Sequence, residues 1–187
     1  MKRYSIDKIH ISITNLNKTL IFLKDCIDNK KNGYICVTNA RTSYLANLDS
    51  NYCDIQNNSL LTVPDGMPLV WIADNIGYKE VGRVSGKNLM NALFKLSVKE
   101  GYSHYFYGCS QKTIDLLHNK LLFQYPDLDI KAAVSPPFQS IESYDIETLA
   151  KQINELKPTF FWCGLGAPKQ ERLIALLQPH LISSISI

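Results

Sequence analysis

One stretch decides the fold class of this sequence: Thr159-Phe160-Phe161-Trp162-Cys163-Gly164-Leu165-Gly166-Ala167-Pro168-Lys169-Gln170-Glu171. Its first five residues are apolar, aromatic or β-branched, which is typical of a buried strand. A glycine turn follows, and Pro168 is suited to begin a helix because its fixed backbone angle is favoured in the first helical turn. The stretch therefore predicts a strand, a tight turn and a helix from Pro168 to about Leu177.

The same order of strand and helix occurs several times upstream. Apolar runs predict further strands at residues 34–37, 60–63, 105–107 and 130–134. Helical periodicity and capping residues predict helices at residues 40–48, 85–101, from 110 onward and 145–156. Near-continuous apolar strands that alternate with amphipathic helices indicate a parallel sheet covered on both faces. We therefore predict an α/β fold, with a doubly wound, mainly parallel sheet of Rossmann-like type.

The composition and charge of the chain argue against several classes of function. The 187 residues are 45% hydrophobic and 20% charged, which suits one globular domain over residues 1–187. The net charge of +3 is too small and too scattered to predict nucleic-acid binding. Neither a bilayer-spanning apolar run nor a secretion signal stands out, so we expect a cytoplasmic chain. Five scattered cysteines and four isolated histidines predict reduced, buried thiols and no metal site.

Parallel sheets bind ligands beyond the carboxyl ends of their strands. Two of these ends carry polar side chains suited to a sugar or phosphate. Thr38 and Asn39 follow the strand at 34–37, although capping the next helix is the more usual role for such residues. Asp65 lies in Pro64-Asp65-Gly66-Met67-Pro68, a stiff turn that can present the carboxylate to a cleft as a general base.

Two further segments favour an anion. Arg83 precedes a helix that begins near Ser85, where guanidinium and backbone N–H groups can bind phosphate together; a plain surface arginine is the competing interpretation. The glycine turn at 164–166 begins like a dinucleotide fingerprint, but Lys169 stands where the third glycine belongs and the later acid is missing. We therefore reject a nicotinamide or flavin site and expect Lys169 and Gln170 to bind phosphate.

These segments, together with Tyr107-Gly108 and Ser135-Pro136-Pro137-Phe138, resemble in their order the WecG/TagA/CpsF family of bacterial glycosyltransferases. The resemblance runs from about residue 34 to the end, and the Gly-x-Gly-x-Pro-Lys-Gln-Glu block is its most specific part. It implies a UDP-sugar donor of the N-acetylmannosamine type and a polyprenyl-diphosphate-linked acceptor at the inner face of the cell membrane. It also implies inverting transfer in cell-surface polysaccharide synthesis, without a metal or another cofactor.

The resemblance also implies residue roles. Asp65 matches the proposed catalytic base, and cationic groups such as Arg83 and Lys169 would stabilise the departing UDP. The remaining substrate-binding residues implied are Thr38, Asn39, Tyr107, Gly108, Gly164, Gly166 and Gln170. Asp127-Leu128-Asp129 matches the D-x-D pattern of metal-dependent glycosyltransferases, but we expect it at the opposite end of the sheet and assign it no metal.

Two expectations concern the end of the sequence. Family members usually continue into a basic C-terminal segment that helps membrane docking, whereas this chain stops soon after its last predicted helix. We therefore expect one glycosyltransferase domain without that segment, with little of its own to dock to a bilayer and an exposed apolar patch that would favour self-association. The alternative is a nucleotide-sugar-binding module or inactive paralogue without transferase activity.

Overall fold

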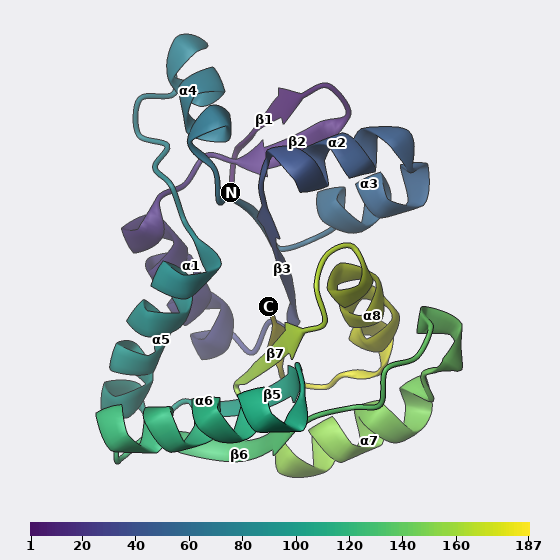
Figure 1. Cartoon of the computed structure of the whole chain (residues 1–187). Coiled ribbons are helices and arrows are strands. Elements are labelled where there is room, and N and C mark those ends of the chain that lie inside the picture. Colours follow the sequence, from purple (N-terminus) through teal and green to yellow (C-terminus); the bar gives the residue numbers. More distant parts are fainter.

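A six-stranded parallel sheet organises the molecule (Figure 1). The structure is a computed structural model that describes residues 1–187. Every neighbouring pair of strands in the sheet is parallel. Across the sheet the strands are β4 (Leu61–Pro64), β3 (Gly33–Thr38), β8 (Ile185–Ser186), β7 (Phe160–Gly164), β5 (Ser103–Gly108) and β6 (Asp129–Val134). The predicted doubly wound α/β fold is confirmed.

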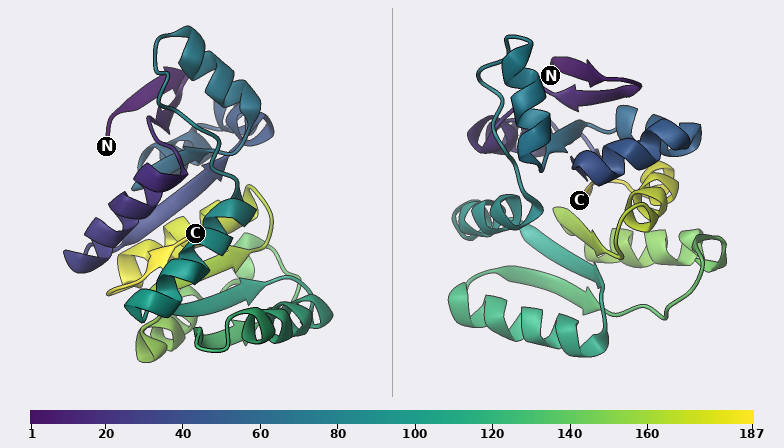
Figure 2. Two further views of the ribbon diagram at one scale, coloured as in Figure 1. Left: turned by 90° about the vertical axis from the view of Figure 1, so that its left-hand side faces the viewer. Right: turned by 45° about the horizontal axis from the view of Figure 1, so that its top comes forward.

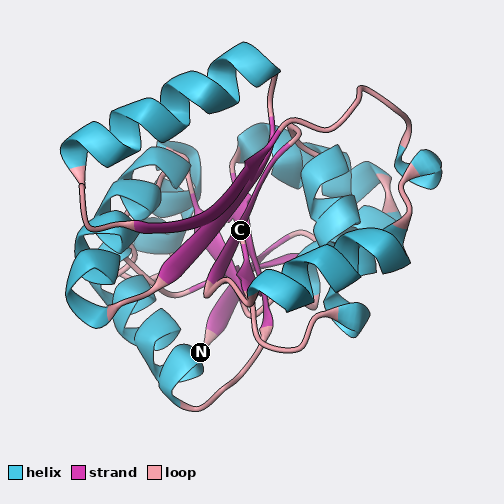
Figure 3. Ribbon diagram, turned by 90° about the horizontal axis from the view of Figure 1, so that it is seen from below, coloured by secondary structure: helices cyan, strands magenta, loops and turns pink.

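Helices cover both faces of the sheet (Figure 3). One face packs against α1 (Leu16–Asp28), α5 (Gly86–Glu100) and α6 (Gln111–Gln124). The other packs against α7 (Ile146–Leu156) and α8 (Lys169–Leu177). Strand β7 shows why its sequence is apolar throughout, because alternate residues enter different cores. Phe160 and Trp162 belong to the first core, and Phe161 and Cys163 to the second.

A third core lies beside β4 and holds elements that the sequence analysis did not identify. An antiparallel hairpin, β1 (Arg3–Ile6) with β2 (Ile9–Ser12), packs there against three helices (Figure 2). These are α2 (Ala40–Leu48), α3 (Ser50–Asn57) and α4 (Met67–Asn75). Only α2 of these five elements was predicted. Short 3₁₀ turns, η1 (Ile141–Ser143) and η2 (Gln178–His180), complete the structure.

The predicted capping residues begin their helices as expected. Side-chain oxygens of Asn39, Ser85, Ser110 and Asp145 each accept a hydrogen bond from the backbone N–H three residues later. Gly101 ends α5 in a left-handed conformation. Pro168 stands just before α8, which begins at Lys169, one residue later than predicted. Local sequence therefore specified these boundaries well.

The last residues are part of the sheet, which the sequence analysis did not expect. Strand β8 lies between β3 and β7 in the sheet. The Ile187 N–H donates to the Phe161 carbonyl at 2.9 Å, and the Ile187 carbonyl accepts from the Cys163 N–H at 2.8 Å. The segment after the last helix therefore joins the two halves of the sheet.

Candidate functional site

A hollow lies where the carboxyl ends of β3, β4, β7 and β8 meet, as expected for a doubly wound sheet. It holds about 680 Å³ of open space, including its mouth. Polar side chains from separated parts of the chain line it together with apolar ones: Val37, Asn39, Thr42, Asp65, Gly86, Met90, Trp162, Cys163, Ala167, Gln170 and Ile187. We call this set of residues the Asp65 hollow.

Asp65 follows β4 and is held by the neighbouring strand, since its backbone N–H donates to the Thr38 carbonyl at 2.7 Å. Its side chain is 23% exposed, enough for a substrate to reach it. A guanidinium nitrogen of Arg83 lies 3.3 Å from Asp65 Oδ1. Asp65 and Arg83, which belong to separate motifs in the sequence, therefore form an ion pair at the edge of the hollow.

Asn39 has the capping role that the sequence predicted, and its position leaves the substrate-binding role open as a prediction. Its Oδ1 accepts from the Thr42 N–H, and the Thr42 hydroxyl accepts from the Asn39 N–H, which forms a reciprocal cap on α2. Asn39 also lines the hollow. Thr38 differs, because its side chain is buried and its hydroxyl donates to the Gln56 side chain. Its predicted contact with substrate gains no support from this placement.

Three helices begin at the hollow. Asn39 caps α2, Gly86 is the first residue of α5, and Gln170 lies in the first turn of α8. The first N–H groups of a helix lack intrahelical partners and carry a partial positive charge, so they favour anions. Together with Arg83, they give one end of the sheet a set of donors suited to phosphate oxygens.

Gln170 is held by two hydrogen bonds inside the chain. Its side-chain oxygen accepts from the Gly166 N–H at 3.0 Å, and its Nε2 donates to Glu171 Oε1 at 3.2 Å. Glu171 is thus a functional candidate that the sequence analysis overlooked, although it stands in the quoted motif. The pair fixes the turn at Gly166, where a positive φ of 83° suits glycine.

Glu171 is itself buried, with a side-chain oxygen that has no hydrogen-bond partner. Burial raises the pKa of this carboxyl above its usual value. Tyr52 on α3 lies beside it, and burial together with the Glu171 charge raises the pKa of the Tyr52 hydroxyl. The Glu171 carboxyl therefore keeps its proton to a higher pH than an exposed glutamate does.

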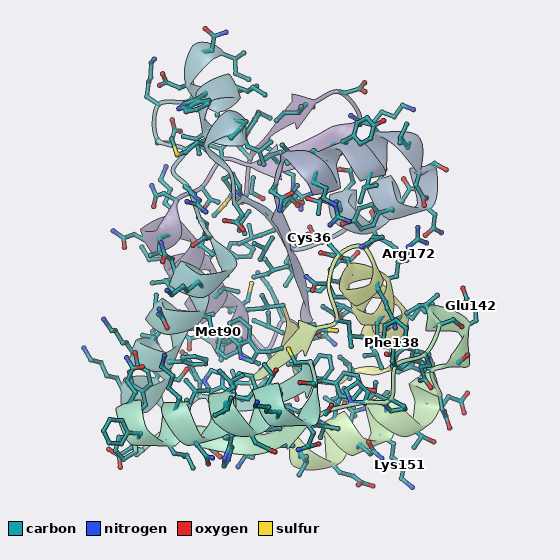
Figure 4. The ribbon with its side chains drawn as sticks, viewed as in Figure 1. Cys36, Met90, Phe138, Glu142, Lys151 and Arg172 are labelled. Carbon is teal, nitrogen blue, oxygen red and sulfur yellow. The ribbon has the colours of Figure 1, made fainter.

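Lys169 lines a second hollow rather than the Asp65 hollow. The residues around this second hollow are Cys109, Ser110, Ser135, Pro136, Pro137, Phe138, Tyr144, Gly164, Leu165 and Lys169. Its ammonium group donates to the Gln139 carbonyl and lies 5.0 Å from the ring centroid of Phe138 and 5.3 Å from that of Tyr144. Phe138 lines the second hollow and Met90 lines the Asp65 hollow. Figure 4 labels the two residues on opposite sides of β7. Lys169 is thus near the sheet end, as predicted, but separated from Asp65 and Asn39.

Gly108 allows β5 and β7 to approach each other closely. A Cβ atom there would lie 2.5 Å from the Gly164 backbone, and its φ of 135° also suits glycine. The side chain of Tyr107 is buried against Tyr144 and Phe161 in the second core, and burial raises the pKa of its hydroxyl. Tyr107, Gly108 and Gly164 also line a hollow that shares Met90, Trp162, Cys163 and Ile187 with the Asp65 hollow, so their role in shaping a nucleotide cleft stays a prediction.

The remaining sequence predictions are placed as follows. Asp129 begins β6 and forms an ion pair with Lys131, so the Asp127–Asp129 pattern lies at the end of the sheet opposite the Asp65 hollow, as predicted. Four cysteines are buried, but Cys109 is exposed beside the second hollow, which corrects that part of the expectation. Thr42, Gly86, Met90, Trp162 and Ile187 line the Asp65 hollow without having been singled out.

Comparison with known proteins gives a family match along nearly the whole chain. A model described as "Glycosyl transferase WecG/TagA/CpsF family" matches residues 4–187. The N-acetylglucosaminyldiphosphoundecaprenol N-acetyl-beta-D-mannosaminyltransferase of Bacillus subtilis (strain 168) is 26% identical over 175 residues, which cover 93% of this chain and 66% of that protein. The protein of the same name from Staphylococcus aureus (strain NCTC 8325 / PS 47) is 24% identical over 154 residues, covering 82% of this chain and 59% of that protein. The match thus spans about two thirds or less of these relatives' length.

Proposed function

Because the chain belongs to the WecG/TagA/CpsF family of glycosyl transferases, we propose that it transfers an N-acetylmannosamine-type sugar from a UDP-sugar to a polyprenyl-diphosphate-linked saccharide. The names of the two relatives support this sugar and this kind of acceptor. The observation that carries the proposal is the Asp65 hollow, where a partly exposed carboxylate, an arginine and three helix N-termini surround one space. The product would enter cell-surface polysaccharide synthesis.

Asp65 would act as the general base. The acceptor hydroxyl would lose its proton to the Asp65 carboxylate while its oxygen forms a bond to the anomeric carbon. The bond from that carbon to the UDP oxygen would break on the opposite face, and UDP would leave with the electron pair. A general base in such a step contributes about 10²–10⁴-fold. Attack from the opposite face inverts the configuration of the sugar.

The donor diphosphate would be bound by the cationic and N–H groups around the hollow. Arg83 is half exposed and contacts Asp65 through one nitrogen, so other guanidinium donors remain for phosphate oxygens. The first turns of α2, α5 and α8 would add backbone donors and a favourable dipole. Donors fixed in advance stabilise the charge that develops on the leaving group.

The acceptor would be reached at the inner face of the cell membrane. No helix has both the length and the apolar character needed to cross a bilayer. Because a polyprenyl tail stays in the bilayer, the enzyme would work as a peripheral protein with the Asp65 hollow near the membrane surface.

The first experiment separates transfer from binding alone. Calorimetry would measure affinity for UDP, the UDP-sugar and NAD, and a second assay would follow radiolabelled sugar to a synthetic acceptor with a short lipid. We expect UDP and UDP-sugar to bind, NAD not to bind, and product to form in the presence of a chelator. Binding without transfer, also in a longer version of the chain, would favour the nucleotide-sugar-binding module. NAD binding without UDP binding would contradict the proposal.

A further inference from the structure

Helix α4 is apolar on its exposed side as well as on its buried side. Leu69 and Ala73 enter the third core and are buried. The opposite side carries four large apolar residues that are 40–62% exposed, here called the α4 outer face. They are Met67, Trp71 and Ile72 on the helix and Ile76 at its C-cap. Surface helices normally carry polar residues on the side away from the core. An apolar outer face of this kind indicates that something covers it.

The α4 outer face lies next to the Asp65 hollow. Helix α4 begins at Met67, two residues after Asp65, with only Gly66 between them. Figures 1 and 2 show α4 at the edge of the molecule, with no other element packed on its outer side. Its inner side is held in place, because the Tyr4 hydroxyl donates to the Leu69 carbonyl at 2.8 Å. A partner that covers the α4 outer face would therefore lie close to Asp65, the candidate catalytic carboxylate.

The size of the face favours a lipid surface over a second protein. A stable protein interface takes about 20–30 residues from each side, whereas the α4 outer face offers four. Its residue types suit a bilayer boundary, where an amphipathic helix lies in the membrane plane with its apolar side in the acyl region. Tryptophan is especially common at that depth because its ring is apolar and its N–H can meet water.

The charge next to the face is balanced. Lys79, Arg83 and Lys87 follow α4 and are exposed. Lys79 is paired with Asp74 at 2.9 Å and Arg83 with Asp65 at 3.3 Å, which leaves Lys87 against Glu80. The apolar side chains of the α4 outer face therefore carry the contact, and a lipid surface of either charge suits it.

We propose that the α4 outer face rests on the surface of a lipid bilayer and holds the mouth of the Asp65 hollow close to the lipid headgroups. The inference deepens the proposed function, on which the identity of the acceptor rests. It differs from the expectation that the chain has little of its own for membrane docking, because that expectation considered net charge and not the exposed apolar residues of α4.

Flotation with vesicles tests the proposal. The vesicles would contain phosphatidylcholine with about one third phosphatidylglycerol, and no substrate would be added. We expect the wild-type chain to float. The double variant Trp71→Gln/Ile72→Gln should lose at least about tenfold in partition coefficient, or about 1.4 kcal/mol, because two apolar side chains no longer leave water for the lipid. Phe123→Gln is the matched control, because Phe123 is 89% exposed on α6, at the opposite edge in Figure 1. This variant should float like the wild type.

Fluorescence identifies the contact directly. The chain has two tryptophans, and Trp162 is buried in the first core while Trp71 is exposed. Lipids brominated on the acyl chain should quench Trp71 emission in the wild type, and the remaining Trp162 emission in the double variant should be unchanged. Absence of quenching, or equal flotation of the wild type and the double variant, would overturn the proposal. If wild type fails to float and the double variant converts a dimer to a monomer in ultracentrifugation, the face joins two copies instead.

The outcomes also separate this inference from the proposed function. Transfer to a water-soluble, short-chain acceptor needs no vesicle and should be the same in the wild type and the double variant, since Trp71 and Ile72 lie outside the Asp65 hollow. Flotation without any transfer would overturn the proposed function alone. Transfer without flotation would overturn the membrane contact alone.

Discussion

At the scale of single residues, the neighbouring side chains of one segment have different tasks. Thr38 and Asn39 are adjacent, yet the first is buried against Gln56 and the second lines the Asp65 hollow. Lys169 and Gln170 likewise serve different hollows. Successive residues on a strand or in the first turn of a helix point in different directions, so a motif read as one unit divides into separate groups. Asp65 is the residue whose placement agrees best with its predicted role.

Asp65→Asn tests the general base, because it keeps the shape and removes the proton acceptor. We expect the transfer rate to fall by about 10²–10⁴-fold, with UDP affinity within about threefold of the wild type. Asp115→Asn is a matched control, since Asp115 is an exposed aspartate on α6 that accepts only from Gln111. Initial rates with saturating donor would measure the effect. A rate within a few-fold of the wild type would exclude Asp65 as the base.

Glu171 provides a second test at this scale. Glu171→Gln keeps an acceptor for the Gln170 amide and removes a carboxyl whose charged form is disfavoured by burial. We expect it to retain wild-type melting temperature and transfer rate. Glu171→Leu removes the acceptor, and loss of a hydrogen bond of about 1 kcal/mol should lower the transfer rate about fivefold by freeing Gln170 and the Gly166 turn. Equal losses in both variants would show that the charged carboxylate is needed.

At the scale of elements, the central strands carry a buried titratable group. His104 on β5 is completely buried, and its Nδ1 accepts from the Trp162 indole N–H on β7 at 2.9 Å. The ring also stacks on Phe160, with centroids 5.5 Å apart. Burial lowers the pKa of His104 to about 4, and the nearby Asp129 opposes that shift. The histidine therefore belongs to the core as a neutral residue.

Acid should weaken the fold through His104. The ordinary pKa of histidine in the unfolded chain is about 6.5, so between pH 6.5 and about 4 the unfolded state binds more protons than the folded state. Stability should therefore be complete above pH 6.5 and fall as the pH falls, by up to about 3 kcal/mol near pH 4. Urea unfolding at several pH values would measure the loss. His104→Gln should reduce the pH dependence, and His180→Gln, at an exposed site, should leave it unchanged.

At the scale of the whole molecule, the sequence specified the sheet better than its edges. Strands β3, β4, β5 and β7 were predictable because both faces are covered, which makes their sequences mainly apolar. The edge strand β6 was predictable from its short apolar run, Ala132 to Val134, although Asp129 and Lys131 are polar. Strand β8 was not, because Ser184, Ile185 and Ser186 alternate in polarity and the strand is only two residues long. All three are buried, and the Ser184 hydroxyl donates to the Pro158 carbonyl at 2.7 Å. The burial of such a serine cannot be recognised from the sequence alone, because it depends on a hydrogen-bond partner elsewhere in the chain.

The location of the candidate site was predictable from the sequence, but the contacts within it were not. Fold class predicted that ligand-binding groups would meet at the carboxyl ends of the strands, and Asn39, Asp65 and Gln170 do line one hollow. The ion pair between Asp65 and Arg83 and the buried Glu171 depend on contacts between distant segments, which periodicity does not encode. The hairpin and α4 were missed for a related reason. They form a third core with its own pattern, and α4 is apolar on both sides, so neither strand nor helix period is clear there.

The position of β8 leads to the last prediction. Because β8 is the strand between β3 and β7, its side chains hold together the two halves of the molecule that contribute to the Asp65 hollow. Ile185 is 1% exposed in the first core, whereas Ile182, three residues earlier, is 76% exposed. Ile185→Ala should cost about 2–5 kcal/mol of unfolding free energy and weaken UDP binding, and Ile182→Ala should stay within about 0.5 kcal/mol of the wild type. Denaturant unfolding and calorimetry on the two variants would measure this difference. Equal stability of the two variants would mean that the last strand contributes little to the fold, and that β3 and β7 stay in register without it.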